Sequence, residues 1–123
     1  MRKKQVEEIC DSVIEWCVKN HGCSKFYDGL PIVEIEFEEP RGIRAEYDSM
    51  NNLMTIYVRG NRSVKQLVKS VLHEYRHYLQ SPTWLERYST MYRRKQDKNP
   101  YEIDAEIFAD SNWKVCMLEL NLQ

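Results

Sequence analysis

Apolar residues recur at helical spacing near the start of the chain. Over residues 3–20 they fall three or four positions apart, which predicts an amphipathic helix that ends at His21 and Gly22. The apolar positions of this helix are Val6, Ile9, Cys10, Val13, Trp16 and Cys17. One face of the helix is therefore expected to cover part of a core.

The pattern then changes to the alternation typical of strands. In residues 31–40, Val33, Ile35 and Phe37 alternate with three glutamates, which predicts a half-buried strand with a solvated acidic face. Residues 43–47 and 53–58 flank the turn-rich sequence DSMNN and predict a hairpin. Strands followed by helices predict an α+β fold with an N-terminal helix and a short three-stranded antiparallel or mixed sheet. Residues 1–123 are expected to form a single domain.

Three helices are predicted in the second half of the chain, each from a capping residue. Ser63 opens a helix over 64–80, Thr83 opens one over about 84–95, and Asn99 opens a third. Each capping residue is followed three positions later by Gln or Glu, as in a capping box. The hydrophobic residues after each cap then continue at helical spacing.

The helix over 64–80 carries the chemistry. Its residues lie about 100° apart around the axis, so its apolar side chains form one face that must meet the core. Four polar residues lie away from that face and are expected in solvent: Lys65, Lys69, Arg76 and Gln80. The flank between the two faces, where a cleft wall would lie, holds Ser70, His73, Glu74 and His77.

This flank contains the sequence HEYRH, which has the HExxH spacing of metalloproteases. His73 and His77 are one helical turn apart, so both imidazoles can bind one zinc ion. Glu74 is rotated by about 100° from His73 and can act on a water molecule as general base. The alternative is a solvated helix flank with two titrating histidines.

A third ligand is expected from the acidic residues of 99–110. Glu102, Glu106 and Asp110 form one stripe of a helix that is apolar on most other sides, so we expect this helix to be largely buried and its acids to need partners. Glu102, which lies 25 residues after His77 (102 − 77), is the predicted third metal ligand. Glu106 is predicted to orient a ligand histidine from outside the metal shell.

Two alternatives give these acids structural tasks. Glu102 could close a capping box with Asn99, and Glu106 or Asp110 could pair with Arg93 or Arg94. A further acid, residue 104, lies on the opposite side of the helix and is expected in solvent.

Composition narrows the classes of partner. The formal net charge of −1 gives no general argument for nucleic acid or an anionic membrane, and YRRKQDK (92–98) is expected to be a solvated helix end rather than a nucleic-acid site. The apolar runs are shorter than the roughly 18 residues of a membrane span, and the N-terminus lacks the apolar core of a signal peptide. We therefore expect a cytoplasmic protein that does not bind membranes. The cysteines form no CxxC pair and are expected to be small buried side chains: Cys10, Cys17, Cys23 and Cys116.

The motifs HEYRH and EIDAEIFAD together resemble the gluzincins, zinc metallopeptidases in which HExxH is followed by a downstream glutamate. The order of elements over about residues 30–118 is similar, more narrowly, to small ImmA/IrrE-type peptidases, which are often associated with phages or mobile elements and act on a partner protein. The resemblance implies one zinc ion per chain on His73, His77 and Glu102, with Glu74 as the base that drives peptide hydrolysis. The chain departs from the narrower family at Glu106, where Asn is usual, and in lacking a terminal Leu-Met-Pro run.

The resemblance also implies a protein or peptide substrate held along an edge strand, for which LMTIYVRG (53–60) is the candidate, with an ordinary sheet strand as the alternative. The residue that stabilises the oxyanion is left open among Tyr88, Tyr92, Tyr101 and His21. The competing function is a metal-binding or protein-interaction module without catalysis.

Overall fold

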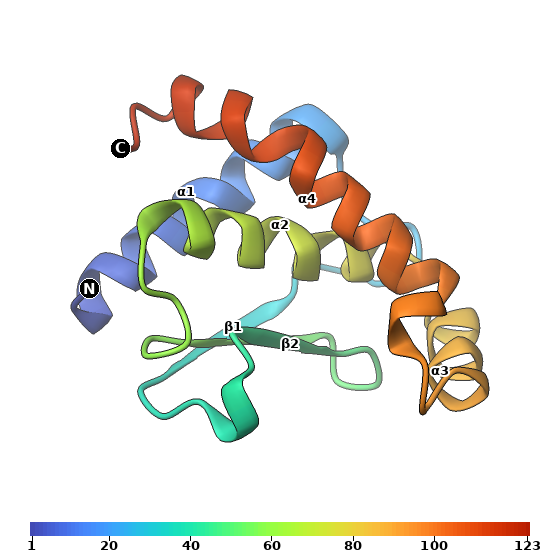
Figure 1. The fold of residues 1–123 in the computed structure, drawn as a ribbon. Coiled ribbons are helices and arrows are strands. Elements are labelled where there is room, and N and C mark those ends of the chain that lie inside the picture. Colours follow the sequence, from blue (N-terminus) through green and yellow to red (C-terminus); the bar gives the residue numbers. More distant parts are fainter.

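The computed structural model describes all 123 residues apart from the side chain of Pro40. Its helices are α1 (Lys3–His21), α2 (Val64–Leu79), α3 (Pro82–Met91) and α4 (Pro100–Glu119), as Figure 1 shows. Its strands are β1 (Ile32–Glu36), β2 (Ala45–Asp48) and β3 (Leu53–Tyr57). Two short 3-10 turns, η1 (Pro40–Gly42) and η2 (Gln96–Lys98), lie in the connections. The predicted α+β class and the predicted order of elements are confirmed.

The three strands form a mixed sheet in the order β1-β3-β2. The predicted hairpin is confirmed, since β2 and β3 pair antiparallel, with Ala45 opposite Ile56. On its other side β3 pairs in parallel with β1, where Ile35 also lies opposite Ile56. The expectation that residues 53–60 form an edge strand is therefore wrong, because β3 has β1 on one side and β2 on the other. The open edge beside the hairpin belongs to β2.

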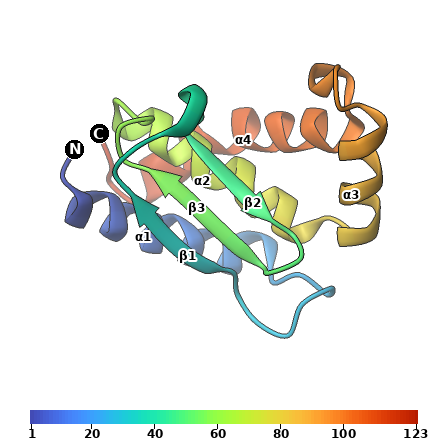
Figure 2. The ribbon, with the colours of Figure 1, turned by 90° about the horizontal axis from the view of Figure 1, so that it is seen from below.

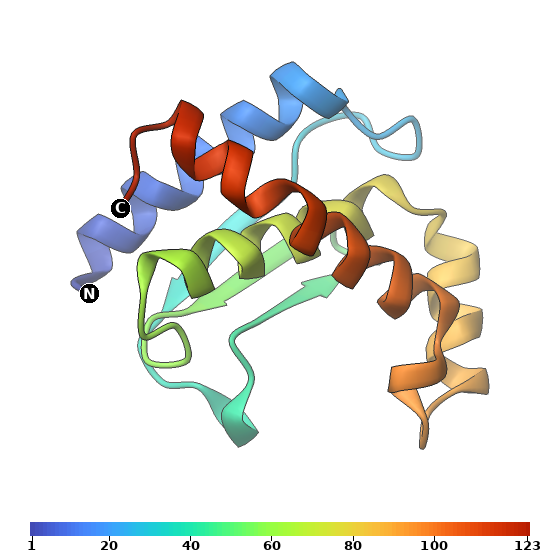
Figure 3. The same ribbon diagram turned by 45° about the horizontal axis from the view of Figure 1, so that its top comes forward.

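The helices cover one face of this sheet. Figure 2 shows α1 and α2 behind the strands, with α1 over β1 and α2 over β2 and β3. Apolar residues from α1, β3 and α2 fill the space between, including the buried Val13, Ile56 and Leu72. Helix α4 lies across α2 on the side away from the sheet (Figure 3). Its C-terminal half reaches α1, where Trp16 Nε1 donates a hydrogen bond of 2.7 Å to Glu119.

The position of α4 corrects the expectation for the polar face of α2. Lys65 is exposed as expected, although it also lies over an aromatic ring of α4. Lys69 and Arg76 are half-buried and Gln80 is buried, because α4 runs antiparallel to α2 and faces them with partners of matching chemistry. These contacts are Lys65 over the Trp113 ring at 4.2 Å, Lys69 with Asp110 at 2.7 Å, Arg76 with Asp104 at 2.7 Å, and Gln80 Nε2 with the Tyr101 carbonyl at 3.0 Å.

The same contacts correct two further expectations. Asp104 is half-buried against Arg76 rather than solvated. Asp110 and Glu106 pair with Lys69 and His73, so the alternative that they pair with Arg93 or Arg94 is wrong.

Helix α4 is the outermost layer and is less buried than predicted. Its inner side buries Ala105, Phe108, Ala109 and Cys116, while its outer side exposes large apolar residues. Those exposed residues are Ile103, Ile107, Val115 and Leu118. The sequence pattern was apolar on most sides, but only one side of the helix has a neighbour to pack against.

Several local predictions are also tested. Gly22 ends α1 with a φ of 79°, a conformation that glycine adopts readily, and Cys10, Cys17 and Cys116 are buried as expected. Cys23 is exposed, contrary to expectation, because it follows the end of α1. Phe37 is exposed because β1 ends at Glu36.

The N-terminus of α3 also differs from the prediction. Ser81, rather than Thr83, caps the helix, with Pro82 at its first position. Among the residues that the structure describes, no helix is both long and apolar enough to cross a membrane.

Candidate metal centre

Two helix caps place the residues of the site. Ser63 accepts a hydrogen bond of 3.1 Å from the Gln66 amide and starts α2, which then presents His73 and His77 one turn apart. Asn99 accepts one of 2.9 Å from the Tyr101 amide and starts α4, which places Glu102 in its first turn. Because the two helices run antiparallel, the start of α4 lies beside the end of α2.

The geometry brings the predicted residues together. Glu102 Oε1 lies 3.0 Å from His73 Nε2 and 2.7 Å from His77 Nε2. The ligand atoms of His73, Glu74 and His77 lie within 4.8 Å of one another, so these residues form a group that could hold a metal ion. The alternative of Glu102 as a capping side chain is wrong, because its carboxylate faces the histidines.

The other ring nitrogens also have partners. Gln80 Oε1 lies 2.6 Å from His77 Nδ1, and Glu106 Oε2 lies 3.1 Å from His73 Nδ1. The Gln80 amide nitrogen donates to the Tyr101 carbonyl, so its oxygen is free to accept a hydrogen bond from His77 Nδ1. Partners of this kind fix the ring orientation and direct the Nε2 lone pair toward a metal.

Sequence reasoning missed Gln80. It lies three residues after His77 and therefore on nearly the same side of the helix. This spacing is the feature of the sequence that could have identified it as a partner of His77. The hydrophobic pattern of α2 predicts solvent around Gln80, because this pattern does not reveal that α4 covers the polar side of α2. Gln80 is in fact buried, with 7% of its surface exposed.

The charges of the site favour protonated imidazoles. Burial alone would lower the pKa of His73, but its bond to Glu102 and the charges of Glu74 and Glu106 outweigh burial and raise the pKa to about 9. Burial would also lower the pKa of His77, but its bond to Glu102 and the charge of Glu74 outweigh burial and raise the pKa. Burial would raise the pKa of Glu102, but its bonds to the two histidines hold it well below the usual range.

Glu74 differs from Glu102. It is buried, and this burial raises its pKa in spite of the two nearby histidines. In this arrangement, the positive charges of two protonated imidazoles balance the negative charges of the carboxylates around them. A divalent cation would balance the same acids, and two imidazole nitrogens with a carboxylate oxygen are donors that zinc and related metals accept. The residues present therefore fit a metal ion.

His73, Glu74 and His77, called the metal group below, lie in the wall of a cleft that follows β2. A hollow of about 350 Å³ between β2 and the α3–α4 region is lined by Tyr47, Leu85 and Tyr101 together with the metal group. A second hollow, of about 250 Å³, continues past His73 beside residues 42–45, which lead into β2. The cleft therefore extends to both sides of the metal group.

Of the four candidates for oxyanion stabilisation, Tyr101 lines this cleft. His21 lies instead against the Phe108 ring, with 4.8 Å between ring centroids. Tyr88 packs edge-on against Tyr101, with 5.0 Å between centroids, and Tyr92 packs against Tyr88. Tyr101 is thus the candidate whose position relates it to the metal group.

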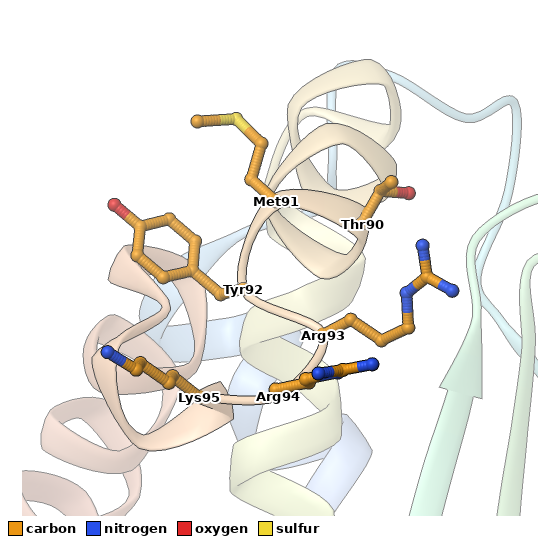
Figure 4. A pocket seen from close by; sticks show the side chains of 6 residues that line it. All are labelled: Thr90, Met91, Tyr92, Arg93, Arg94 and Lys95. Carbon is orange, nitrogen blue, oxygen red and sulfur yellow. The ribbon is translucent and has the colours of Figure 1, made fainter.

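A larger hollow, of about 540 Å³, lies at the turn after α3 and away from the metal group. It is formed by residues 90–95, which include the basic sequence expected to be a solvated helix end. Figure 4 shows that Lys95 points away from Arg93 and Arg94, so the three cations do not share one face. This hollow adds no residue to the site.

No model of a known protein family matches the sequence, and no curated protein or solved structure matches it either. The functional assignment therefore depends on the geometry of the site: a group on α2 that could bind metal, in contact with Glu102 of α4 and beside an open sheet edge.

Proposed function

We propose that the protein is a zinc-dependent endopeptidase of the gluzincin type, with zinc held by His73, His77 and Glu102. The observation that supports this most is the convergence of both histidine Nε2 atoms on Glu102 Oε1, at 3.0 and 2.7 Å. Three protein ligands leave a coordination position open, as in catalytic rather than structural zinc sites. The order of elements suggests the small ImmA/IrrE-type peptidases, and with them a cytoplasmic location and a mobile-element origin.

Zinc bound at this group would polarise a peptide carbonyl and make water more acidic. The Glu74 carboxylate, beside both imidazoles, takes a proton from the attacking water and passes it to the nitrogen of the leaving amine. Gln80 and Glu106 keep the two rings oriented while the proton moves.

The substrate is proposed to be an extended segment of a partner protein. The open edge of β2 offers main-chain hydrogen bonds to such a segment. The cleft follows β2 on one side of His73 and residues 42–45, ahead of β2, on the other, which suits cleavage within a chain rather than at its end.

The first test is the metal content of the purified protein. We expect close to one zinc per chain in the parent and much less in His77→Ala and Glu102→Ala. Asp110→Ala is the matched control, because Asp110 belongs to the same stripe of α4 but pairs with Lys69. Absence of zinc from the parent after reconstitution would exclude the proposed site.

The second test separates catalysis from metal binding. Glu74→Gln should keep the zinc and the fold but lose cleavage of peptides, because the amide cannot accept the proton. Retained hydrolysis in a pure Glu74→Gln preparation would contradict the mechanism.

The second candidate function is a metal-binding interaction module without catalysis. The exposed apolar residues Val115 and Leu118 on the outer side of α4 favour it, since exposed apolar surface often marks binding sites. Full zinc content in a protein that cleaves nothing, as parent or variant, would select this function.

A further inference from the structure

The outer side of α4 carries a row of exposed aliphatic side chains. The exposed fractions are 43% for Ile103, 59% for Ile107, 42% for Val115 and 76% for Leu118. We call these four residues the α4 stripe, which extends over about 22 Å of helix. None of them lines the cleft along β2. The proposed peptidase chemistry therefore makes no use of this surface.

The stripe is arranged symmetrically along α4. Its two isoleucines lie near the start of the helix, and Val115 and Leu118 lie near its end, at nearly equal distances from a midpoint at residues 110–111. A twofold axis brings the same patch of two molecules together, so that residue i meets residue j and j meets i. Two α4 helices that run in opposite directions and meet at this midpoint therefore place each aliphatic pair against the other pair.

The start of α4 also has room for a side chain of a second copy. A hollow of about 450 Å³ lies between η2 and this part of the helix, and Ile103 and Ile107 are its aliphatic lining residues. In the antiparallel arrangement the residue opposite Ile103 is Leu118, the most exposed member of the stripe. Leu118 of a second copy can therefore enter this hollow, and the symmetry provides the same contact twice.

The charges beside the stripe distinguish between the two possible directions of the second helix. Glu106, Asp110 and Lys114 follow one another at intervals of one turn on one flank of the stripe, and all three are exposed. In an antiparallel pair, Lys114 of each copy lies next to Glu106 and Asp110 of the other. In a parallel pair, the two lysines would lie at the same level and the two helix dipoles would point the same way. The charges therefore favour the antiparallel arrangement.

We infer that the α4 stripe is the contact between two copies of this chain, which form a twofold dimer with antiparallel α4 helices. Packed helices lie about 8–10 Å apart, and Ser111 at the midpoint is small enough for this approach. A single helix pair covers less than the roughly 800 Å² per partner of a standard interface, so the dimer is weak and forms at micromolar or higher concentration. The contact needs no metal ion and is independent of the proposed peptidase function.

The first experiment measures the molecular mass of the metal-free protein by sedimentation equilibrium, from micromolar to millimolar concentration. A chelator and a reductant are present, so that neither a metal ion nor the exposed Cys23 can link two copies. We expect a reversible equilibrium of monomer and dimer. Leu118→Asp should weaken association at least about tenfold, because it removes an aliphatic group and places a carboxylate against Ile103. Met50→Asp is the matched control, since Met50 is 81% exposed in the turn between β2 and β3.

The second experiment measures the direction of the two helices. Pro100→Cys, in a Cys23→Ser background, carries a spin label at the exposed start of α4. In the antiparallel dimer the two labels lie at opposite ends of the helix pair, about 30 Å apart along the axis. In a parallel dimer they would lie within about 10 Å of each other. Electron paramagnetic resonance distinguishes these distances, in pulsed mode for the longer and in continuous-wave mode for the shorter one.

Each outcome decides the inference. A dimer with the longer label distance, which Leu118→Asp weakens and Met50→Asp leaves intact, supports it. A protein that stays monomeric at millimolar concentration would overturn it and would leave the stripe to a helix of a different protein. A dimer on which Leu118→Asp has no greater effect than Met50→Asp, or whose labels lie close together, would overturn it as well. Zinc content and cleavage are measured separately, so the peptidase proposal is unaffected by these results.

Discussion

At the scale of single residues, Gln80 determines how His77 can act. Its side-chain oxygen accepts from Nδ1, which leaves Nε2 as the only nitrogen that can bind a metal. Its amide nitrogen is held in turn by the Tyr101 carbonyl and by Asp104, at 3.0 and 2.9 Å. The ring of His77 is thus fixed by contacts that reach into α4.

We therefore predict that Gln80→Ala will weaken zinc binding about 10- to 100-fold, the usual effect of losing a partner of a ligand histidine. Gln66→Ala is the control, since Gln66 lies at the far end of the same helix and accepts from the Arg62 amide. Competition titration against a chelating dye measures both affinities. Equal affinities in the two variants would show that Gln80 does not orient His77.

Glu102 illustrates how far sequence reasoning reaches at this scale. The spacing of His73 and His77 and the start of a helix at Asn99 could be predicted from local patterns, and those patterns placed Glu102 near the histidines. The same patterns allowed a capping role for Glu102. Only the antiparallel packing of α2 and α4 decides between these roles, and that packing depends on contacts between residues far apart in sequence.

At the scale of elements, the unexpected feature is that α2 is covered on two sides. The sheet and α1 bury its apolar face, and α4 covers the charged side with acids and aromatic rings. A helical wheel identifies a polar side but cannot distinguish solvent from a neighbouring helix with complementary charges. For the same reason the parallel pairing of β1 with β3 could not be predicted, whereas the local hairpin could.

A second contact between elements fixes the start of β2 beside the cleft. Asn61 is 1% exposed and donates to the Arg44 and Tyr57 carbonyls, at 2.9 and 2.8 Å, while Ser70 of α2 donates to its side-chain oxygen at 2.7 Å. Next to it, Gly60 leaves room for the backbone of residues 43–44. The edge that borders the cleft is thus joined to the helix that carries the metal group.

Gly60→Ala should therefore be destabilising. The added Cβ would lie 2.6 Å from the Ile43 carbonyl oxygen and 2.9 Å from Arg44 Cα, and both are backbone atoms that must move. We predict that the free energy of unfolding falls by about 1–3 kcal/mol, measured by urea unfolding of the metal-free protein.

Gly29→Ala is the matched control for this change. A Cβ at Gly29 would meet nothing within 4 Å, so its effect should stay within about 0.5 kcal/mol. Equal stabilities of the two variants would show that the close approach at Gly60 relaxes without cost.

At the scale of the whole molecule, the site connects distant parts of the chain. Its histidines belong to α2, which packs on the sheet and α1, while Glu102 belongs to the outer layer. A metal ion bound by all three would link the layers and would be lost when the chain unfolds. Metal binding and global stability are therefore expected to be coupled.

We predict that zinc raises the free energy of unfolding by about 2.7 kcal/mol when free zinc is about 100 times its Kd, and that a chelator reverses the effect. Glu102→Ala should abolish the increase, whereas Asp110→Ala should lower the baseline stability slightly and retain the increase. Thermal unfolding with and without zinc measures this. A zinc-induced increase that persists in Glu102→Ala would place the metal elsewhere.

The connection between α2 and α4 differs from these two helices in its burial. Helix α3 is exposed or half-buried along its length, and the cleft takes Leu85 and Ser89 from this connection. The group that could bind metal comes from α2, and the proposed third ligand, Glu102, comes from α4. Under the proposed peptidase function, sequence changes between residues 82 and 98 would alter which polypeptides fit the cleft without changing the metal ligands. Related proteins would then differ in target mainly through this segment, and grafted sequences there would redirect it.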